Sequence, residues 1–126
     1  MSVSNDYCIM WIEKDILYGI YKEKPMDIEG AKSVVRMRKS LQNGAVNPAV
    51  IDIRNIKRVT KEARSFLASD EACEGITKCA IIIDSNLSMV FGNIYLKINK
   101  PPVPSKLFTS LLEARKWAES AAKEAV

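Results

Sequence analysis

Two aspartates are the residues best placed for catalytic chemistry. Asp52 lies in the apolar run Ala49–Ile53 and Asp84 follows the run Lys78–Ile83, so both would lie near the C-terminal ends of buried strands. Open α/β sheets hold their ligands at that edge, and two carboxylates there could work as a general acid and base. A structural interpretation is simpler, because Asp84 can help to cap a helix and Asp52 needs only a Lys, an Arg or loop amides as partners. We favour the structural interpretation.

Histidine is absent from all 126 residues. This excludes Ser-His and Cys-His nucleophile pairs, His-ligated zinc and an imidazole pH switch. The spacing of the three cysteines, Cys8, Cys73 and Cys79, matches neither a zinc motif nor a paired disulfide framework. The acidic neighbours of Cys73 would raise the pKa of its thiol, which makes it a poor nucleophile. The five glycines stand alone, so no phosphate-binding loop is present. We therefore expect no enzyme activity, no metal and no cofactor.

Length and composition indicate one globular domain over residues 1–126. Hydrophobic residues make up 48% and charged residues 27% of the chain, which is ordinary for a folded domain. The longest apolar run, Cys79–Ile83, is far shorter than the ~20 residues that cross a bilayer, and the polar N-terminus lacks a secretion signal. With an odd number of cysteines, these features predict a cytoplasmic protein without a transmembrane segment.

Strand and helix patterns alternate along the chain. Residues Tyr7–Ile12 and Ile16–Tyr21 predict an antiparallel hairpin, and a helix should run from Asp27 to a left-handed stop at Asn43-Gly44. The elements predicted after it are a strand at Ala49–Ile53, a helix capped by Thr60, a strand at Lys78–Ile83, a helix from Leu87 to about Ile98, a strand at Ser105–Phe108 and a helix capped by Thr109 or Ser110. The order β β α β α β α β α predicts an α/β fold with a mixed sheet, an N-terminal hairpin and about four helices.

The helix from Leu87 to Ile98 is the most apolar. At 100° per residue, one arc should face the sheet, and it consists of Leu87, Val90, Phe91, Ile94, Tyr95 and Ile98. Met89 and Leu96 project on the opposite side of this helix. They could form a contact surface for a second copy of the chain or for another partner. Alternatively, they are two exposed apolar residues of the kind that ordinary protein surfaces contain.

Two stretches resemble known domains. The block from Ala49 to Leu67 is similar to the centre of STAS domains, and the stretch from Gly92 to Phe108 resembles short bacterial SpoIIAA-like proteins of unassigned function. The resemblance implies a STAS-like fold and a regulator that binds a protein partner. In the well-studied branch of the family, an Asp-Ser pair at the start of the second helix is phosphorylated. Thr60 and Lys61 occupy the matching positions here, so the phosphorylated serine is not retained. We interpret Thr60 as the N-cap of the second helix.

Positive charge is concentrated in one part of the chain. Residues 32–64 contain nine Lys or Arg and two acidic residues, whereas the rest of the chain has a small acidic excess. The predicted partner- or anion-binding face consists of Lys32, Arg36, Lys39, Arg58, Thr60, Lys61 and Arg64, with an ordinary solvated surface as the alternative. No aromatic residue lies between Lys22 and Arg64, and the usual nucleic-acid motifs are absent, which argues against a nucleic-acid partner.

Two functions follow from these patterns. The first is a non-enzymatic STAS-like regulatory module that binds an unidentified protein partner and can self-associate as a homodimer. The alternative is a small-ligand or lipid-binding protein, which the resemblance suggests because such folds are compared with lipid-transfer domains. Its pocket would lie between the sheet and the helix from Leu87, framed by Phe91, Tyr95 and the loop Pro101–Pro104, and would need a few hundred cubic ångströms.

Overall fold

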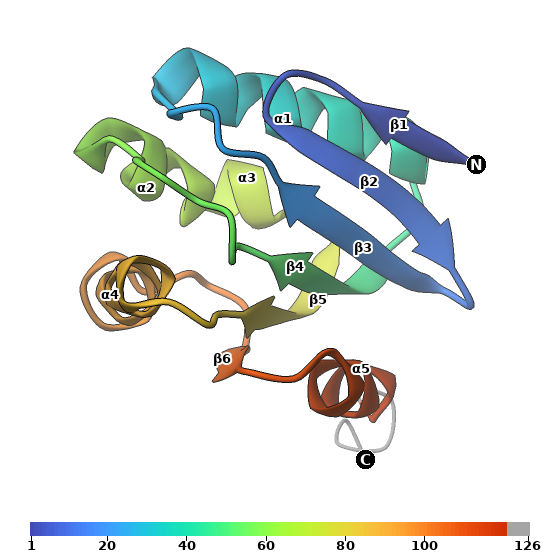
Figure 1. Cartoon of the computed structure of the whole chain (residues 1–126). Helices are drawn as coiled ribbons and strands as arrows, with labels where there is room; N and C mark the ends of the chain where they lie inside the picture. The colour runs from blue at the N-terminus through green and yellow to red at the C-terminus, as the bar shows by residue number, and fades with distance from the viewer. Residues whose placement is uncertain (121–126) are drawn as a thin grey trace.

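A mixed sheet forms the centre of the protein, and the computed structural model describes it for residues 1–120 (Figure 1). In spatial order its strands are β1 (Ser2–Ser4), β2 (Cys8–Glu13), β3 (Ile16–Tyr21), β4 (Asn47–Asp52), β5 (Ile76–Ile82) and β6 (Ser105–Phe108). The first three strands pair antiparallel, and β3 to β6 pair parallel. The predicted hairpin and mixed α/β sheet are confirmed. The rest of the predicted domain 1–126 lies outside the described residues.

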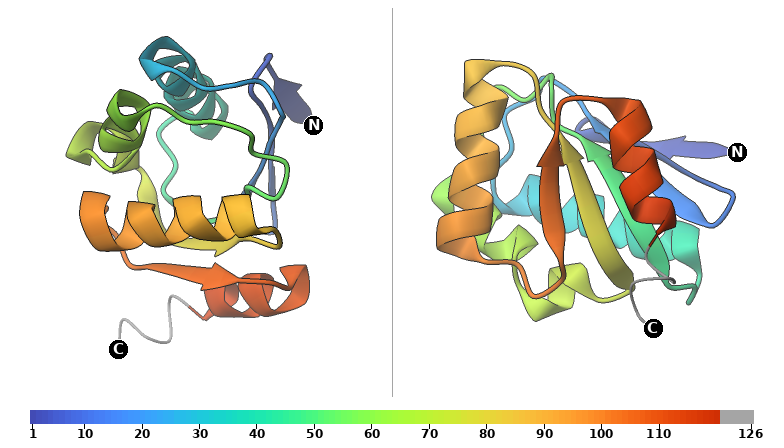
Figure 2. Two further views of the ribbon diagram at one scale, coloured as in Figure 1. Left: turned by 60° about the vertical axis from the view of Figure 1, so that its left-hand side comes forward. Right: turned by 90° about the horizontal axis from the view of Figure 1, so that it is seen from below.

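Helices cover both faces of this sheet. One face packs against α1 (Ile28–Gln42), α2 (Lys61–Leu67), α3 (Asp70–Cys73) and α4 (Asn86–Ile94), which continues as the π-helical turn η1 (Tyr95–Asn99). The other face packs against α5 (Leu111–Glu119). Figure 2 shows β5 and β6 between α4 and α5. Each parallel pair is joined by a crossover through one of these helical layers, as the predicted alternation of strand and helix requires.

Side-chain caps start the helices at the predicted positions. The Asp27 carboxylate accepts the amide of Gly30 at 2.9 Å, and the Thr60 hydroxyl accepts the amide of Ala63 at 3.1 Å. Ser110 caps α5 in the same way, and Asn43 ends α1 in the left-handed conformation at φ 47°. These caps satisfy backbone groups that the first and last helical turns leave unpaired, so local sequence decides them.

Three short elements were not predicted. Strand β1 has three residues, α3 has four, and η1 replaces the end of the expected regular helix. None of them is long enough to produce a hydrophobic period in the sequence.

The predicted sheet-facing arc of α4 is wrong for part of its residues. Phe91 and Tyr95 pack against the core, as predicted. Leu87, Val90 and Ile98 are 47%, 56% and 71% exposed. The residues buried against the sheet are Ser88 and Gly92, because a Cβ atom at Gly92 would lie only 2.9 Å from Cδ2 of Leu107. Small residues let the helix approach β6 closely, so the face that carries them turns inward.

The predicted exposed pair on this helix is half wrong. Met89 is 43% exposed, but Leu96 is half-buried and packs against the core beneath α1 and α4. Leu96 lies in η1, where the wider π-helical turn shifts the phase of the side chains after Ile94. The two residues therefore do not form one surface strip.

Candidate functional site

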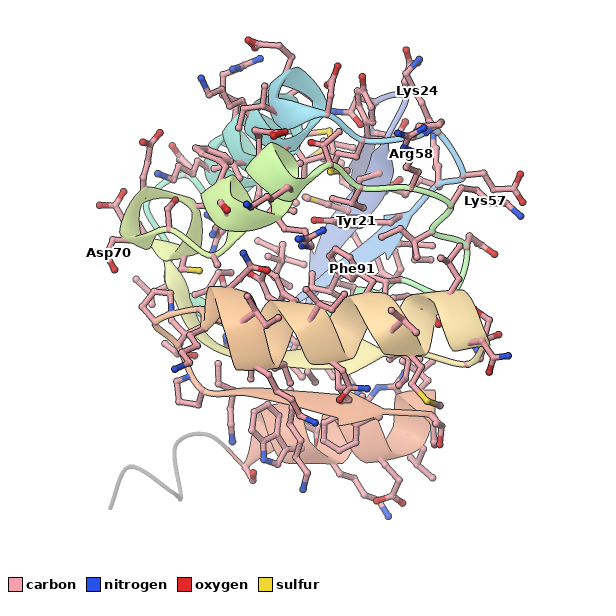
Figure 3. The ribbon with its side chains drawn as sticks, turned by 90° about the vertical axis from the view of Figure 1, so that its left-hand side faces the viewer. Tyr21, Lys24, Lys57, Arg58, Asp70 and Phe91 are labelled. Atoms are coloured by element: carbon pink, nitrogen blue, oxygen red, sulfur yellow. The ribbon has the colours of Figure 1, made fainter. Side chains whose placement is uncertain are left out.

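A small parallel bridge joins the segments that precede α1 and α2. The amide of Met26 donates to the carbonyl of Arg58 at 2.8 Å, and the amide of Thr60 donates to the carbonyl of Met26 at 3.0 Å. This bridge holds the loop from Ile53 to Thr60 beside the start of α1. Figure 3 shows Lys24, Lys57 and Arg58 together at this end of the molecule, far from Asp70 at the other end. The bridge thus fixes where the loop presents its cations.

A groove of about 210 Å³ lies between this loop and α4. Its apolar lining comes from Ile56, Val59, Leu87, Val90, Phe91 and Ile94, and its cations are Lys57, Arg58 and Arg64. Within the part of the chain that the structure describes, no acidic residue belongs to this lining. The groove therefore combines an apolar floor with a rim of one charge sign.

Electrostatic partners for these cations are scarce in the described part of the chain. The ion pairs there are Lys39 with Glu74 at 3.3 Å and Arg54 with Asp52 at 2.8 Å. Arg64 donates from Nε to the side-chain oxygen of Asn99 at 3.3 Å, which ties α2 to η1 and leaves its charge uncompensated. The rim of the groove is therefore positive.

The predicted basic face is divided by the structure. Arg58 and Arg64 line the groove, and Lys61 is exposed at the first position of α2. Lys32 and Arg36 are exposed on α1, outside the groove, and Thr60 caps α2. Lys39 lies in the last turn of α1, paired with Glu74.

Sequence reasoning missed part of the groove lining. Lys57 was counted among the local cations but not among the site residues, and Leu87, Val90 and Ile94 were assigned to the core. The signal that could have found them is the pair of small residues Ser88 and Gly92, which mark the sheet-facing side of α4.

Asp52 is held by its own loop. Its carboxylate accepts from Nε and Nη2 of Arg54 at 3.0 and 2.8 Å, and from the Arg54 backbone amide at 3.0 Å. Burial alone would raise the pKa of Asp52, but the hydrogen bonds and charge of Arg54 outweigh it and lower the pKa below its ordinary value. Asp84 is exposed, and Ser85 caps α4. Asp52 therefore has the arginine and loop-amide partners that the structural interpretation expects, whereas the predicted capping role of Asp84 belongs to Ser85.

The three thiols are free. Burial raises the pKa of Cys8 and of Cys79 to about 12, and burial also raises the pKa of Cys73. Within residues 1–120, no cluster of three or more acidic or cysteine side chains could hold a metal ion. The thiols are therefore protonated packing groups at neutral pH.

A second hollow lies under α4. This apolar cavity of about 100 Å³ is lined by the sheet, α1, α2, α3, α4 and η1, and its lining includes Phe91, Tyr95 and Val103 of the Pro101–Pro104 loop. The two aromatic rings stack with centroids 5.9 Å apart, and the Tyr95 hydroxyl donates to the carbonyl of Leu67 at 2.8 Å. The cavity is smaller than the few hundred cubic ångströms that were expected.

Comparison with known proteins identifies the family. Residues 10–122 match the family model described as "Domain of unknown function (DUF7793)". The chain belongs to this family. The DUF7793 chain is also similar to the crystal structure of an uncharacterized DUF3478-family protein with a SpoIIAA-like fold from Shewanella loihica PV-4. Identity is 18%, the match covers 92% of this chain and 98% of the other, and the TM-score is 0.63.

This likeness shows the fold of the DUF7793 chain and confirms the SpoIIAA-like resemblance read from the sequence. No curated protein matches the chain. Among residues 1–120, no helix has the length and apolar character needed to cross a membrane.

Proposed function

We propose that this protein is a non-enzymatic regulatory module that binds a protein partner in the groove between the Ile56–Val59 loop and α4. The supporting observation is that an apolar floor lies beside three cations, with no acidic lining residue among residues 1–120. The complementary partner is an amphipathic segment, with apolar side chains on one face and acidic side chains beside them. A cytoplasmic location, where free thiols stay reduced, belongs to this proposal.

The floor of the groove is suited to a helix. Leu87, Val90 and Ile94 repeat at helical spacing along α4 and form a continuous apolar row beside the loop. A partner helix laid along this row would bury apolar area, while Arg58 and Arg64 would meet its acidic residues. Charge complementarity would speed association and make it salt-dependent, whereas the apolar contacts would supply most of the affinity.

The test uses two synthetic amphipathic peptides of about 18 residues, long enough to form helices. Both have leucines on one face; the acidic peptide has Glu at its polar positions and the basic peptide has Lys. We expect fluorescence anisotropy to detect binding of the acidic peptide alone, and the double variant Arg58→Glu, Arg64→Glu to abolish it. The matched control, Lys32→Glu with Arg36→Glu, reverses two exposed α1 cations and should bind normally.

Three outcomes would overturn the proposal. They are equal binding of both peptides, normal binding by the Arg58→Glu, Arg64→Glu variant, and loss of binding in the α1 control. Recruitment to phosphatidylserine vesicles through Arg58 and Arg64, without peptide binding, would assign the groove to a membrane surface instead.

Self-association remains a separate prediction for this module. Met89 is the exposed member of the predicted contact pair, and Leu96 is packed inside the molecule. A homodimer through α4 would therefore have to use Met89 together with the groove residues. Sedimentation of the protein with and without the acidic peptide would show whether the two contacts compete.

A second candidate function is small-ligand binding, and the cavity behind Phe91 and Tyr95 favours it. An engineered apolar cavity of about 150 Å³ binds benzene. The cavity of about 100 Å³ therefore suits a short compound rather than the acyl chains of a lipid.

A further inference from the structure

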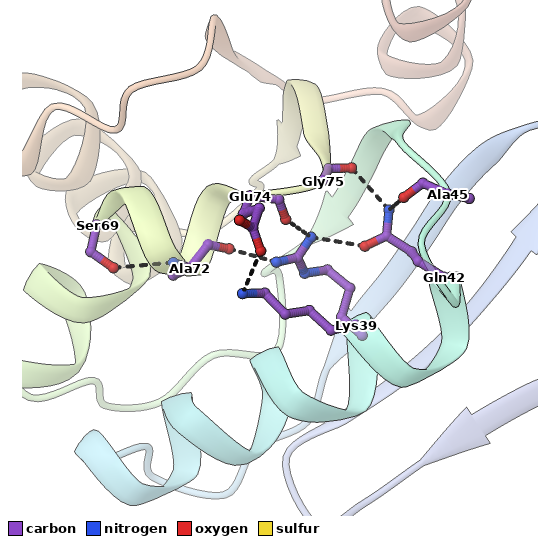
Figure 4. A network of polar contacts seen from close by, with 8 residues as sticks. Lys39, Gln42, Ala45, Ser69, Ala72, Glu74 and Gly75 are labelled. Carbon is purple, nitrogen blue, oxygen red and sulfur yellow. Dashed lines mark hydrogen bonds and ion pairs between the residues drawn. The ribbon is translucent and has the colours of Figure 1, made fainter.

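Arg38 is a buried cation on the inward side of α1. Only 5% of the residue is exposed. Its guanidinium donates to the carbonyls of Ala72 and Glu74 at 2.7 and 3.0 Å and to the Gln42 side-chain oxygen at 2.9 Å. Figure 4 shows these acceptors converging from α1 and the end of α3. All three acceptors are neutral, so the positive charge is hydrogen-bonded but not neutralised.

A carboxylate partner for Arg38 is missing among the described residues. The Glu74 side chain pairs with Lys39 and is 79% exposed, so it faces solvent. Burial lowers the pKa of Arg38, which reflects the cost of keeping this charge away from water. A buried charge is usually paired, and an apolar side chain of similar volume would avoid the cost.

The same arginine lines the apolar cavity under α4 and, among residues 1–120, is the only charged residue of its lining. The other ionisable lining groups are Tyr21, Cys73, Cys79 and Tyr95, and burial raises the pKa of each. None of them supplies a negative charge at neutral pH. Arg38 is therefore the one charged residue in an otherwise apolar and uncharged lining among residues 1–120.

The guanidinium also has donors to spare. Of its five N–H groups, the hydrogen bonds among residues 1–120 use two on Nη1 and one on Nη2, and none uses Nε. A carboxylate can accept two N–H groups of an arginine side by side. Arg38 thus retains the donors that an organic anion would need.

We infer that the cavity under α4 binds a small organic carboxylate, whose charged group pairs with Arg38 and whose short apolar body fills the space beside Phe91 and Tyr95. This inference rests on the second candidate function, ligand binding in that cavity. At about 100 Å³, the cavity is smaller than the ~150 Å³ cavity that binds benzene, so it suits a body of about four carbon atoms. Longer acyl chains would not fit without displacing core side chains.

The test compares pentanoate with pentanol, which share their apolar chain and differ in charge. Binding is measured by titration with amide chemical shifts as the readout. In the wild-type protein we expect pentanoate to bind at least tenfold more tightly than pentanol. Arg38→Met should remove that preference while pentanol binding stays, and Arg38→Lys should retain part of it.

Controls separate this site from the groove and from misfolding. The variant Arg58→Glu, Arg64→Glu keeps Arg38 and should bind pentanoate like the wild type. If Arg38→Met fails to fold, the comparison in the wild-type protein still decides. Equal binding of the two ligands there would overturn the carboxylate inference and leave the cavity proposal standing, whereas binding of neither would overturn both.

Discussion

The outer face of α4 offers the sharpest test of the groove. The double variant Leu87→Ser, Val90→Ser removes two apolar side chains that are 47% and 56% exposed. Full burial of such a side chain contributes about 1.5–3 kcal/mol, and about half of each remains to be buried by a partner. The loss is about 1 kcal/mol per residue, or about 2 kcal/mol in all, which corresponds to a roughly 30-fold weaker Kd.

The assay is fluorescence anisotropy with the acidic amphipathic peptide, and thermal unfolding of the free protein is measured alongside. We expect weaker binding with only a small fall in Tm, similar to that of the control variant, because about half of each side chain is already exposed in the free protein. The matched control is Leu111→Ser, Leu112→Ser, which removes apolar residues of similar exposure, 43% and 55%, from α5. Unchanged affinity in the α4 variant, or an equal loss in the α5 control, would refute the assignment of the partner to this groove.

Three further predictions concern individual side chains. Lys78 is 3% exposed, its ammonium donates to the Trp117 carbonyl at 3.0 Å, and it lies 4.0 Å from the centre of the Trp117 ring. Lys78→Met should therefore lower the free energy of unfolding, measured by urea denaturation, by about 1–3 kcal/mol. An unchanged free energy of unfolding would show that Lys78 does not anchor α5. Because Arg54 lowers the pKa of Asp52, their pair stabilises the fold fully above about pH 4 and loses its effect as the pH falls below that. Asp52→Asn should therefore be less stable than the wild type at pH 7. The difference should shrink as the pH falls below about 4, and a constant difference down to acidic pH would contradict the pairing. With a pKa of about 12, the Cys79 thiol should resist alkylation at pH 8 until the protein unfolds, and rapid labelling of the native protein, read by mass spectrometry, would show that the site opens.

Much of the fold follows from local sequence. Two runs rich in β-branched and aromatic residues, separated by a short polar break, predicted the hairpin. Side chains such as Asp27, Thr60 and Ser110 predicted where helices begin. A cap needs only its own helix, because its oxygen binds an amide two or three residues further along. The order of strands and helices then restricted the topology to a mixed sheet with crossovers.

The candidate site depended on contacts that sequence spacing does not contain. The exposed row on α4 follows from the approach of Gly92 to Leu107, which lies on a different element. The loop cations reach the groove because Met26 and Val59 pair, although 33 positions separate them. Periodicity describes one helix at a time, so it could identify α4 as apolar but could not say which side the sheet would cover.

Arg38 shows the same division between sequence and tertiary structure. In the sequence it is one of nine cations between residues 32 and 64, with nothing to distinguish it from Arg36 or Lys39. In the structure it is buried, while Arg36 is exposed and Lys39 meets Glu74. The sequence by itself determined the elements, their ends and the family resemblance, because these depend on neighbours along the chain. The groove, the cavity and the buried charge were decided by tertiary packing, because each requires side chains from elements far apart in the chain to meet.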